Sequence, residues 1–389
     1  MTGAPRIALF ADTFFEVNGA ARTCREWDAF ARRRGLPFLS IRWNRWPALA
    51  DGGPVWHLDL VRSRASFPID PDLRFDARFL RCLDRVERVV RRFRPEFVHV
   101  TSPGDLGILG AIVAHRIGVP LAASWHTNLH EYAARRLSQL SSWLPQGMRR
   151  HLTEAVERFV MDRVCWFFGR ARVLFAPNPE LARLVATRTG RGVFPMHRGV
   201  DTDLFHPGRR ARTDADLVLG YVGRLMPEKN VRLLPRVAAA LHEAGIDRFR
   251  FQITGSGSER HWLEQHLPRA RFTGVLTGEA LARAYADLDI FLFPSRTDTF
   301  GNVVQEALAS GVPAIVMNEG GPRFIVRDGV TGIVAAGDEE FCAGAVALGA
   351  TERLRREMGR AGRRQVEFQS WDRVFEEVYE AYASPVALV

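Results

Sequence analysis

The stretch FLFPSRTDTFGNVVQEALASGVPA, residues 291–314, constrains the fold more than any other part of the chain. An apolar run at residues 290–293 is typical of a buried parallel strand. A tight turn follows at residues 299–302, where Gly301 allows the backbone to approach a ligand closely. A helix is predicted over residues 303–309. It ends there because Gly311 and Pro313 follow, and these residue types stop helices. The sequence therefore predicts a strand, a turn and a helix in direct succession.

Two carboxylates bracket this turn. Asp298 precedes it, and Glu306 lies about one helical turn after Asn302. The free N–H groups and the dipole of a helix N-terminus favour an anion at this place. The same residues also fit an acidic loop and a solvated helical glutamate, because Asp and Glu make up 44 of the 389 residues. The spacing of the two carboxylates is weak evidence for a ligand site by itself. It becomes specific only together with the predicted strand, turn and helix around it.

Strand, loop and helix alternate along both halves of the chain. The predicted strands that establish this alternation are residues 6–11, 38–43, 55–61, 97–100, 217–222 and 249–253, and the longest predicted helices of the first half are 20–34 and 75–93. Such alternation indicates an α/β fold with doubly wound parallel sheets. A length of 389 residues suits two domains of ordinary size.

Candidate ligand-binding residues follow several of these strands, since ligands of parallel sheets sit at the carboxyl ends of the strands. Gly19 follows the first strand, and His126 follows a strand predicted at residues 121–124. Gly255 and Ser256 follow the strand at 249–253. The loop around Gly19 lacks the G-x-G-x-x-G pattern, which argues against a dinucleotide site. A loop glycine and a lone histidine also fit purely structural roles.

Three segments resemble motifs of the family-four glycosyltransferases, which have the GT-B fold. TDTFGNVVQEALASGVPAIV resembles the family's carboxylate–seven residues–carboxylate motif, with Asp298 where the first acid is usually glutamate. GRLMPEKN matches the family's G-R-L-x-x-x-K-[GN], and HRGVDTDLFHP resembles its interdomain segment, with Arg198 replacing an asparagine. The resemblance implies two Rossmann-like doubly wound domains facing across a cleft. It also implies a retaining transfer from a nucleotide sugar that needs neither a metal nor a cofactor.

The resemblance also implies a role for each candidate residue. Asp298 would contact the hydroxyls of the donor sugar, and Glu306 would hold the nucleotide ribose. The other implied donor-side residues are Gly19 and the loop Gly255 and Ser256 at the nucleotide, the turn residues Phe300, Gly301 and Asn302, and His126 beside the anomeric region.

Arg224 and Lys229 would stabilise the leaving diphosphate, because two fixed cations can balance the charge that it gains. Lys229 is the only lysine among 54 basic residues. The alternative is a pair of solvated charges at a strand end.

The expected domain boundaries follow from the same motifs. We expect an N-terminal acceptor-side domain over residues 1–190, a linker over 191–215 and a nucleotide-sugar-binding domain over 216–369. A C-terminal helix at about 370–389 is expected to pack back on the first domain. The D-x-D patterns at residues 201–203, 214–216 and 287–289 lie in or near the linker or before a strand, and we interpret them as structural rather than metal-binding.

The net charge of +10 indicates polyanionic partners such as nucleotide phosphates, anionic lipids or nucleic acid. Base composition explains it equally well, since nearly all the basic residues are arginines. The sequence has no helix-turn-helix, zinc spacing or RNP-like strand, so a nucleic-acid partner is not expected. Four cysteines without a C-x-x-C spacing fit a reducing compartment, and no signal peptide or run of 18 apolar residues is visible. We therefore expect a cytoplasmic protein.

Residues 130–172 interleave arginines with aromatic and aliphatic residues. This pattern fits a helix lying on an anionic membrane, which would place the protein peripherally on the inner face of the cytoplasmic membrane. It fits equally a core helix that packs its aromatics and solvates its arginines. A membrane face would favour a lipid-linked acceptor.

The donor is predicted from the opening DTFFEVNGAARTCREWDAFARRRGLPFLSI, which looks like that of bacterial GDP-mannose-dependent α-mannosyltransferases. It is also similar to sulfoquinovosyl- and glucosyl-lipid synthases, which use UDP sugars. We expect transfer of a hexose, mannose from GDP-mannose, to a lipid-linked or glycan acceptor. The alternatives are a UDP-sugar-dependent glycolipid synthase, a protein that binds a nucleotide sugar without transferring it, and a nucleic-acid-binding protein.

Overall fold

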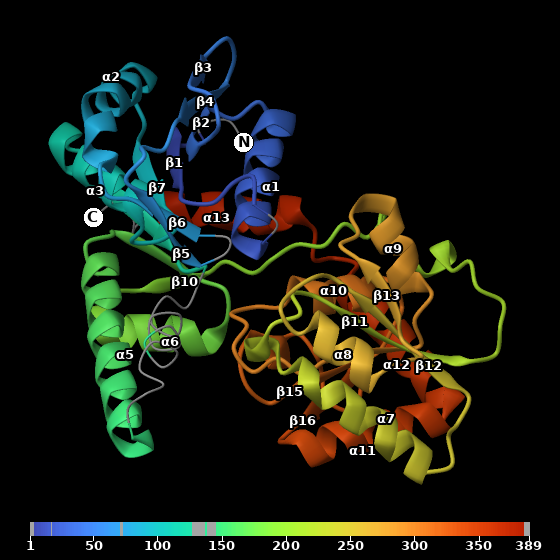
Figure 1. Ribbon diagram of the computed structural model, residues 1–389. Helices are drawn as coiled ribbons and strands as arrows, with labels where there is room; N and C mark the ends of the chain where they lie inside the picture. Colours follow the sequence, from blue (N-terminus) through green and yellow to red (C-terminus); the bar gives the residue numbers. More distant parts are fainter. Residues whose placement is uncertain (1–3, 17, 71–72, 127–136, 138–144, 385–389) are drawn as a thin grey trace. The chain divides into compact units, whose positions relative to one another are not determined.

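The computed structural model describes residues 4–16, 18–70, 73–126, 137 and 145–384. The chain forms two compact units (Figure 1). Unit 1 contains the residues up to His197 together with those from Val374 onward, and unit 2 contains Arg198–Arg373. The predicted linker over 191–215 therefore begins with residues of unit 1.

The sheet of unit 1 has eight strands in the order β10-β9-β8-β7-β1-β2-β4-β3. Its neighbouring strands run parallel except for β3, which pairs antiparallel with β4. The strands are β1 (Ile7–Ala11), β2 (Phe38–Trp43), β3 (Ala48–Ala50), β4 (Val55–Leu60), β7 (Phe97–Val100), β8 (Leu121–Ser124), β9 (Val173–Ala176) and β10 (Val193–Pro195). β1, β7, β8 and β9 are buried at every position, as expected of strands covered on both faces.

The described helices of unit 1 are α1 (Gly19–Arg34), α2 (Leu83–Phe93), α3 (Asp105–Ile117), α5 (Gln146–Phe168), α6 (Pro179–Thr189) and, from Val374 on, α13 (Trp371–Ala383). The Asn18 side chain caps α1 by accepting a hydrogen bond from Ala21 N at 2.8 Å. The C-terminal helix α13 lies on α1, where the Phe375 and Trp27 rings stack with centroids 5.4 Å apart.

The predicted helix over residues 75–93 is wrong in its first half. β5 (Ser66–Asp70) and β6 (Leu73–Asp76) form an antiparallel hairpin, a 3₁₀ turn η1 (Phe79–Cys82) follows, and α2 starts only at Leu83. The buried carboxylate of Asp76 accepts hydrogen bonds from Ser63 N at 2.5 Å and from Arg81 Nη1 at 2.8 Å. These contacts hold Asp76 at the end of the hairpin, so the helix begins only after η1.

The sheet of unit 2 has six parallel strands in the order β13-β12-β11-β14-β15-β16. They are β11 (Leu217–Val222), β12 (Phe249–Thr254), β13 (Arg271–Gly274), β14 (Ile290–Phe293), β15 (Ala314–Met317) and β16 (Gly332–Ala335). The described helices are α7 (Leu234–Glu243), α8 (Arg260–His266), α9 (Gly278–Ala286), α10 (Asn302–Ala309), α11 (Asp338–Ala350) and α12 (Glu352–Val366). The strand order reverses between β11 and β14, which is where doubly wound sheets bind ligands.

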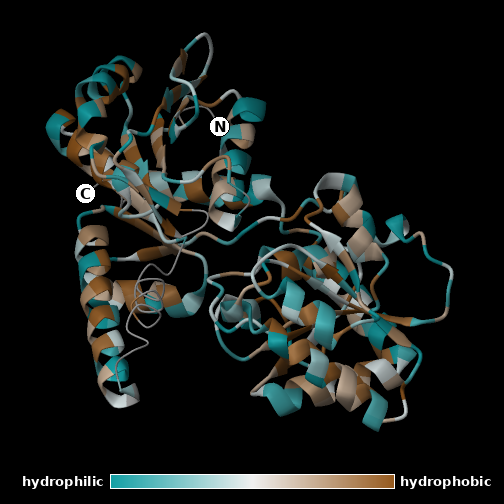
Figure 2. Cartoon of the chain, viewed as in Figure 1, coloured by the Kyte–Doolittle hydropathy of each residue, from teal (hydrophilic) through white to brown (hydrophobic). Residues whose placement is uncertain are grey.

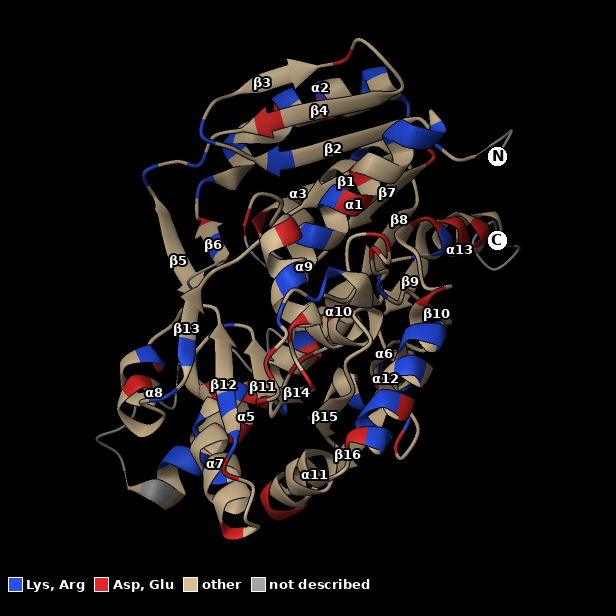
Figure 3. Ribbon diagram, turned by 90° about the vertical axis from the view of Figure 1, so that its right-hand side faces the viewer, with Lys and Arg blue, Asp and Glu red and all other residues tan. Residues whose placement is uncertain are grey.

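Both units are Rossmann-like, so the predicted α/β class with doubly wound parallel sheets is confirmed. Apolar residues concentrate in the strands and on the helix faces turned toward them (Figure 2). Charged residues lie on outward helix faces, for example along α12, whereas β14 and β15 carry none (Figure 3). Among the described helices, none is both long enough and apolar enough to cross a bilayer.

Helix α5 presents two different apolar faces. Met161, Val164, Cys165, Phe167 and Phe168 are buried in the core of unit 1. Phe159 and Trp166, by contrast, are 62% and 55% exposed. Each of these rings lies beside arginine: Arg163 is near both, and the guanidinium of Arg170 lies 3.2 Å from the Trp166 ring centroid. Residues 130–136 and 138–144 of the predicted basic and aromatic segment lie outside the described residues.

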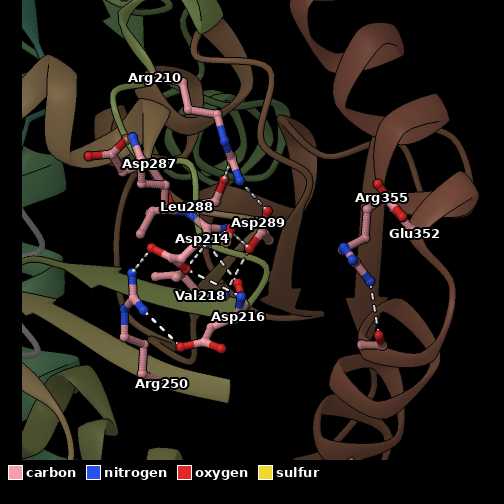
Figure 4. Close-up of polar contacts among 12 residues, drawn as sticks. Arg210, Asp214, Asp216, Val218, Arg250, Asp287, Leu288, Asp289, Glu352 and Arg355 are labelled. Atoms are coloured by element: carbon pink, nitrogen blue, oxygen red, sulfur yellow. Dashed lines mark hydrogen bonds and ion pairs between the residues drawn. The ribbon is translucent and has the colours of Figure 1, made fainter. Parts of the chain in front are cut away.

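Arginines engage the aspartates of the second and third D-x-D patterns (Figure 4). Asp289 accepts from Arg210 Nη2 and from Val218 N, both at 2.8 Å, and also pairs with Arg212. The neighbouring pairs are Arg250 with Asp214 at 2.9 Å and Arg250 with Asp216 at 3.0 Å. This network fastens residues 210–216 to the start of β11.

In the remaining pattern, Asp201 Oδ1 accepts from the backbone N–H groups of Asp203 and Leu204 at 3.1 and 2.9 Å. All three patterns thus have structural contacts.

We predict that Asp289→Ala lowers the free energy of unfolding of unit 2 by about 2 kcal/mol, because it removes the carboxylate that pairs with the largely buried Arg212 and accepts from Val218 N. Hydrogen exchange followed by mass spectrometry should show faster exchange in peptides covering β11. Asp247→Ala is the control, because Asp247 is 74% exposed and pairs only with His242 among the described residues, so a change below about 0.5 kcal/mol is expected. Equal effects of the two substitutions would contradict the proposed fastening.

Candidate active site

The turn between β14 and α10 forms one wall of the candidate site in unit 2. Gly301 has a φ of 103°, a left-handed conformation that favours glycine, and an added Cβ would lie 2.9 Å from Pro322 Cγ. The Gly321 N–H donates to the Asp298 carbonyl at 2.6 Å. The turn at residues 320–322 therefore packs directly against the backbone at residues 298–301 and fixes its path.

Lys229 and Asp298 form the central pair of this site. Lys229 Nζ lies 2.8 Å from Oδ1 and 2.9 Å from Oδ2 of Asp298, although 69 residues separate them in the sequence. The side chains are only 12% and 23% exposed. Burial raises the pKa of Asp298, but the charge and hydrogen bonds of Lys229, assisted by the charge of Arg224, outweigh burial and lower it. Asp298 is therefore a carboxylate at neutral pH.

Arg224 lies two residues beyond the end of β11. Its Nη2 is 3.7 Å from Oε1 of Glu228, and its side chain is 28% exposed. The hydroxyl of the fully buried Tyr221 donates to the Arg224 carbonyl at 2.8 Å. Tyr221 thus fixes the backbone that carries Arg224, a role that sequence reasoning missed because only the folded loop brings the two groups together.

Two backbone hydrogen bonds join the loop that carries Arg224 to the glycine-rich segment after β12. Gly223 N donates to the Thr254 carbonyl at 3.0 Å, and Leu225 N donates to the Ser256 carbonyl at 2.8 Å. Gly255 has a φ of 138°, and an added Cβ would lie 1.9 Å from the Gly223 carbonyl oxygen. A side chain at Gly255 is therefore excluded, and the predicted residues Gly255 and Ser256 lie beside Arg224.

The remaining predicted residues of unit 2 belong to α10 or its entry. Asn302 is the first residue of α10, and Glu306 is buried within it at 3% exposure. Phe300 is also buried, with the Arg198 guanidinium 6.0 Å from its ring centroid. The candidate residues of unit 2 therefore gather around the carboxyl ends of β11, β12 and β14.

The two predicted residues of unit 1 lie at the carboxyl edge of its own sheet. Gly19 begins α1 after β1, and His126 follows β8, with β7 between these two strands. His126 is 8% exposed, and its Nε2 lies 2.6 Å from the Ser124 hydroxyl.

The same edge holds Asp12, which sequence reasoning did not identify. Its carboxylate accepts from Ser102 Oγ at 2.5 Å and from Leu106 N at 2.9 Å. Burial and the neighbouring charge of Asp105 raise the pKa of Asp12 to about 8. Only the packing of α3 on β1 creates this environment, so no local pattern could reveal it.

Within the described part of the chain, no three His, Cys, Asp or Glu side chains cluster as a metal site would require. The fixed positive charge near Asp298 comes instead from Lys229 and Arg224. Two cations, a pair of glycine-bearing loops and a helix N-terminus together can hold a diphosphate-containing ligand.

The chain is similar to several known proteins. Residues 17–204 match the family described as Glycosyltransferase Family 4, and residues 216–350 match Glycosyl transferases group 1. A GDP-mannose-dependent alpha-mannosyltransferase of Mycolicibacterium smegmatis is 36% identical over 305 residues, covering 77% of this chain and 76% of that protein. A protein with the same name from Mycobacterium tuberculosis is 33% identical over 393 residues, covering 97% and 96%.

Among solved structures, sucrose-phosphate synthase from Thermosynechococcus elongatus is similar with a TM-score of 0.73 and 18% identity, covering 99% of this chain and 100% of that one. This likeness concerns the fold alone. Together with the two matched families and the two relatives, it confirms the resemblance inferred from the motifs. The chain belongs to family four of the glycosyltransferases and has their GT-B fold.

Proposed function

We propose that this glycosyltransferase moves a mannosyl group from GDP-mannose to a lipid-linked or glycan acceptor, with retention of configuration at the anomeric carbon. The observation that carries the proposal is the Lys229–Asp298 pair at the edge of a nucleotide-binding type of sheet. The choice of mannose and of GDP is supported by two relatives that are 36% and 33% identical and are named GDP-mannose-dependent alpha-mannosyltransferases.

In the proposed complex, Arg224 and Lys229 hold the donor diphosphate. Asp298 accepts hydrogen bonds from hydroxyls of the donor sugar, and Glu306 holds the ribose. The backbone of Gly19, the loop of Gly255 and Ser256, and the turn of Phe300, Gly301 and Asn302 complete the donor contacts.

The proposed step breaks the bond between the anomeric carbon and the β-phosphate oxygen, and the electron pair stays on that oxygen. The acceptor hydroxyl attacks from the same face, and its proton passes to the departing phosphate. Lys229 and Arg224 stabilise the negative charge that grows on the phosphate. These two fixed cations lead us to propose a reaction that uses neither a metal ion nor a cofactor. His126 is assigned a hydrogen bond near the reacting centre.

We also propose that the protein is cytoplasmic and contacts anionic membrane lipids through α5. The support is the exposed face of α5, where Phe159 and Trp166 lie beside arginines. Exposed aromatic rings insert at the level of lipid headgroups, and arginines attract anionic headgroups. Such a contact would bring the enzyme to a lipid-linked acceptor.

Calorimetric titration of the purified protein with GDP and with UDP, in the presence of EDTA, tests the donor. We predict that GDP binds at least about tenfold more tightly than UDP, a difference of about 1.4 kcal/mol. A preference for UDP would replace the mannosyl proposal by a UDP-sugar-dependent glycolipid synthase on the same fold. Binding of neither nucleotide, with or without a divalent cation, would contradict the donor site itself.

Vesicle flotation tests the membrane contact. We predict that the protein floats with vesicles containing about 30% phosphatidylglycerol and not with neutral vesicles. The double substitution Phe159→Ser and Trp166→Ser should weaken binding by about tenfold or more, because it removes two exposed aromatic rings. Phe368→Ser is the control, since Phe368 is 71% exposed but belongs to unit 2. Equal flotation of the double variant and the unmodified protein would contradict the contact.

A further inference from the structure

We infer that Tyr382, in the C-terminal helix α13, is a positioning residue that sets the tautomer of His126 through His99 and Ser124. This inference rests on the role proposed above for His126. It gives a role to Tyr382, His99 and Ser124, which are buried polar residues outside the proposed donor contacts.

The side chains of Tyr382, His99, Ser124 and His126 form a continuous relay of hydrogen bonds inside unit 1. The Tyr382 hydroxyl lies 2.5 Å from His99 Nδ1, and His99 Nε2 lies 2.7 Å from Ser124 Oγ. Ser124 Oγ lies 2.6 Å from His126 Nε2. Tyr382, His99 and Ser124 are at most 1% exposed, so water does not compete for these bonds.

The fold explains why residues 283 apart in sequence meet here. β7 and β8 are parallel neighbours in which His99 is opposite Ala122. Because side chains alternate along a strand, Ser124 lies on the same face as Ala122 and within reach of His99. The ring of His99 is held edge-on by Trp27 at 4.8 Å, and Tyr382 packs on Phe97 at 4.7 Å (Figure 3 shows α13, β7 and β8).

The protonation of His99 and Tyr382 is fixed by burial. Burial lowers the pKa of His99 to about 3, so its ring is neutral and carries one proton. Burial also raises the pKa of Tyr382 well above its ordinary value, so the hydroxyl keeps its proton. A neutral imidazole donates through one nitrogen and accepts through the other, so the direction of these hydrogen bonds depends on which nitrogen of each histidine is protonated.

The direction of the hydrogen bonds follows from the Tyr382 hydroxyl, which needs an acceptor for its proton. If His99 Nδ1 carried the proton, the buried Tyr382 O–H would have no acceptor among the described residues. An unpaired buried donor is costly, so Tyr382 donates to His99 Nδ1. His99 Nε2–H then donates to Ser124 Oγ. Among the described residues, the other partner of this hydroxyl is His126 Nε2, so we assign the Ser124 proton to that hydrogen bond.

The consequence is that neutral His126 carries its proton on Nδ1. Nδ1 is then the donor nitrogen of His126, and Nε2 accepts from Ser124. A donor at this position suits an oxygen of the substrate, whereas the opposite tautomer would present only an acceptor. The C-terminal helix thus supplies the group that selects the form of His126.

Nitrogen NMR of protein labelled with ¹⁵N-histidine tests the inference, with the His126 signals assigned from a His126→Asn variant. We predict a single Nδ1–H tautomer of His126 in the unmodified protein. Tyr382→Phe should give a mixture of tautomers, because it removes the donor that favours one direction. Ser124→Ala should do the same by breaking the relay beside His126.

Tyr379→Phe is the matched control. Tyr379 lies in the same helix, and its buried hydroxyl makes no hydrogen bond of normal geometry in the described structure. This variant should keep the single tautomer. A His126 protonated on Nε2 in the unmodified protein, or an unchanged tautomer in Tyr382→Phe, would overturn the relay.

A kinetic measurement separates the relay from the proposed reaction. With GDP-mannose as donor, Tyr382→Phe should lower kcat about tenfold, the effect of losing one hydrogen bond, and leave KM for the donor unchanged. A mixed tautomer with an unchanged kcat would overturn the positioning role. If GDP-mannose is not a donor at all, the NMR result still decides the tautomer relay.

Discussion

The pairing of the only lysine with a largely buried carboxylate is the interaction on which the candidate site depends. Lys229 contacts both oxygens of Asp298, and this contact joins the loop after β11 to the turn after β14. Without the lysine, burial would favour the neutral form of Asp298; with it, the pKa of Asp298 is lowered. The pair therefore keeps an anion and a cation fixed side by side at the point where the strand order reverses. A ligand with both hydroxyls and phosphates fits such a pair.

Much of this arrangement could be predicted from the sequence, because it is encoded locally. The apolar run of β14, the glycine at 301 and the helix after it occupy adjacent residues, and each has a simple steric or burial requirement. Parallel sheets bring the ends of their strands to one edge, so Arg224, Ser256 and Asp298 could be expected near one another from the sequence alone. The family motifs then supplied the expected chemistry.

Features that depend on contacts between distant residues could not be predicted. The Asp76 contacts turn the start of an expected helix into a hairpin, and nothing in residues 66–76 alone indicates them. The raised pKa of Asp12 requires the packing of α3 on β1, and the relay from Tyr382 to His126 requires the return of α13 to the first sheet. In α5, aromatic residues two positions apart, such as Trp166 and Phe168, fall on opposite faces, which only the packed helix distinguishes.

In the proposed reaction, Lys229 stabilises a departing phosphate as well as neutralising Asp298. The most direct test compares Lys229→Met with Arg232→Met in single-turnover transfer from GDP-mannose. Arg232 is a matched cation three residues further on, 59% exposed and paired with Glu259. Lys229→Met should slow transfer about 100- to 1000-fold when the rate is normalised to folded protein, since the substitution also leaves the buried Asp298 without its main partner, while Arg232→Met stays within about twofold. Transfer by Lys229→Met at the unmodified rate would show that Lys229 does not stabilise the departing phosphate.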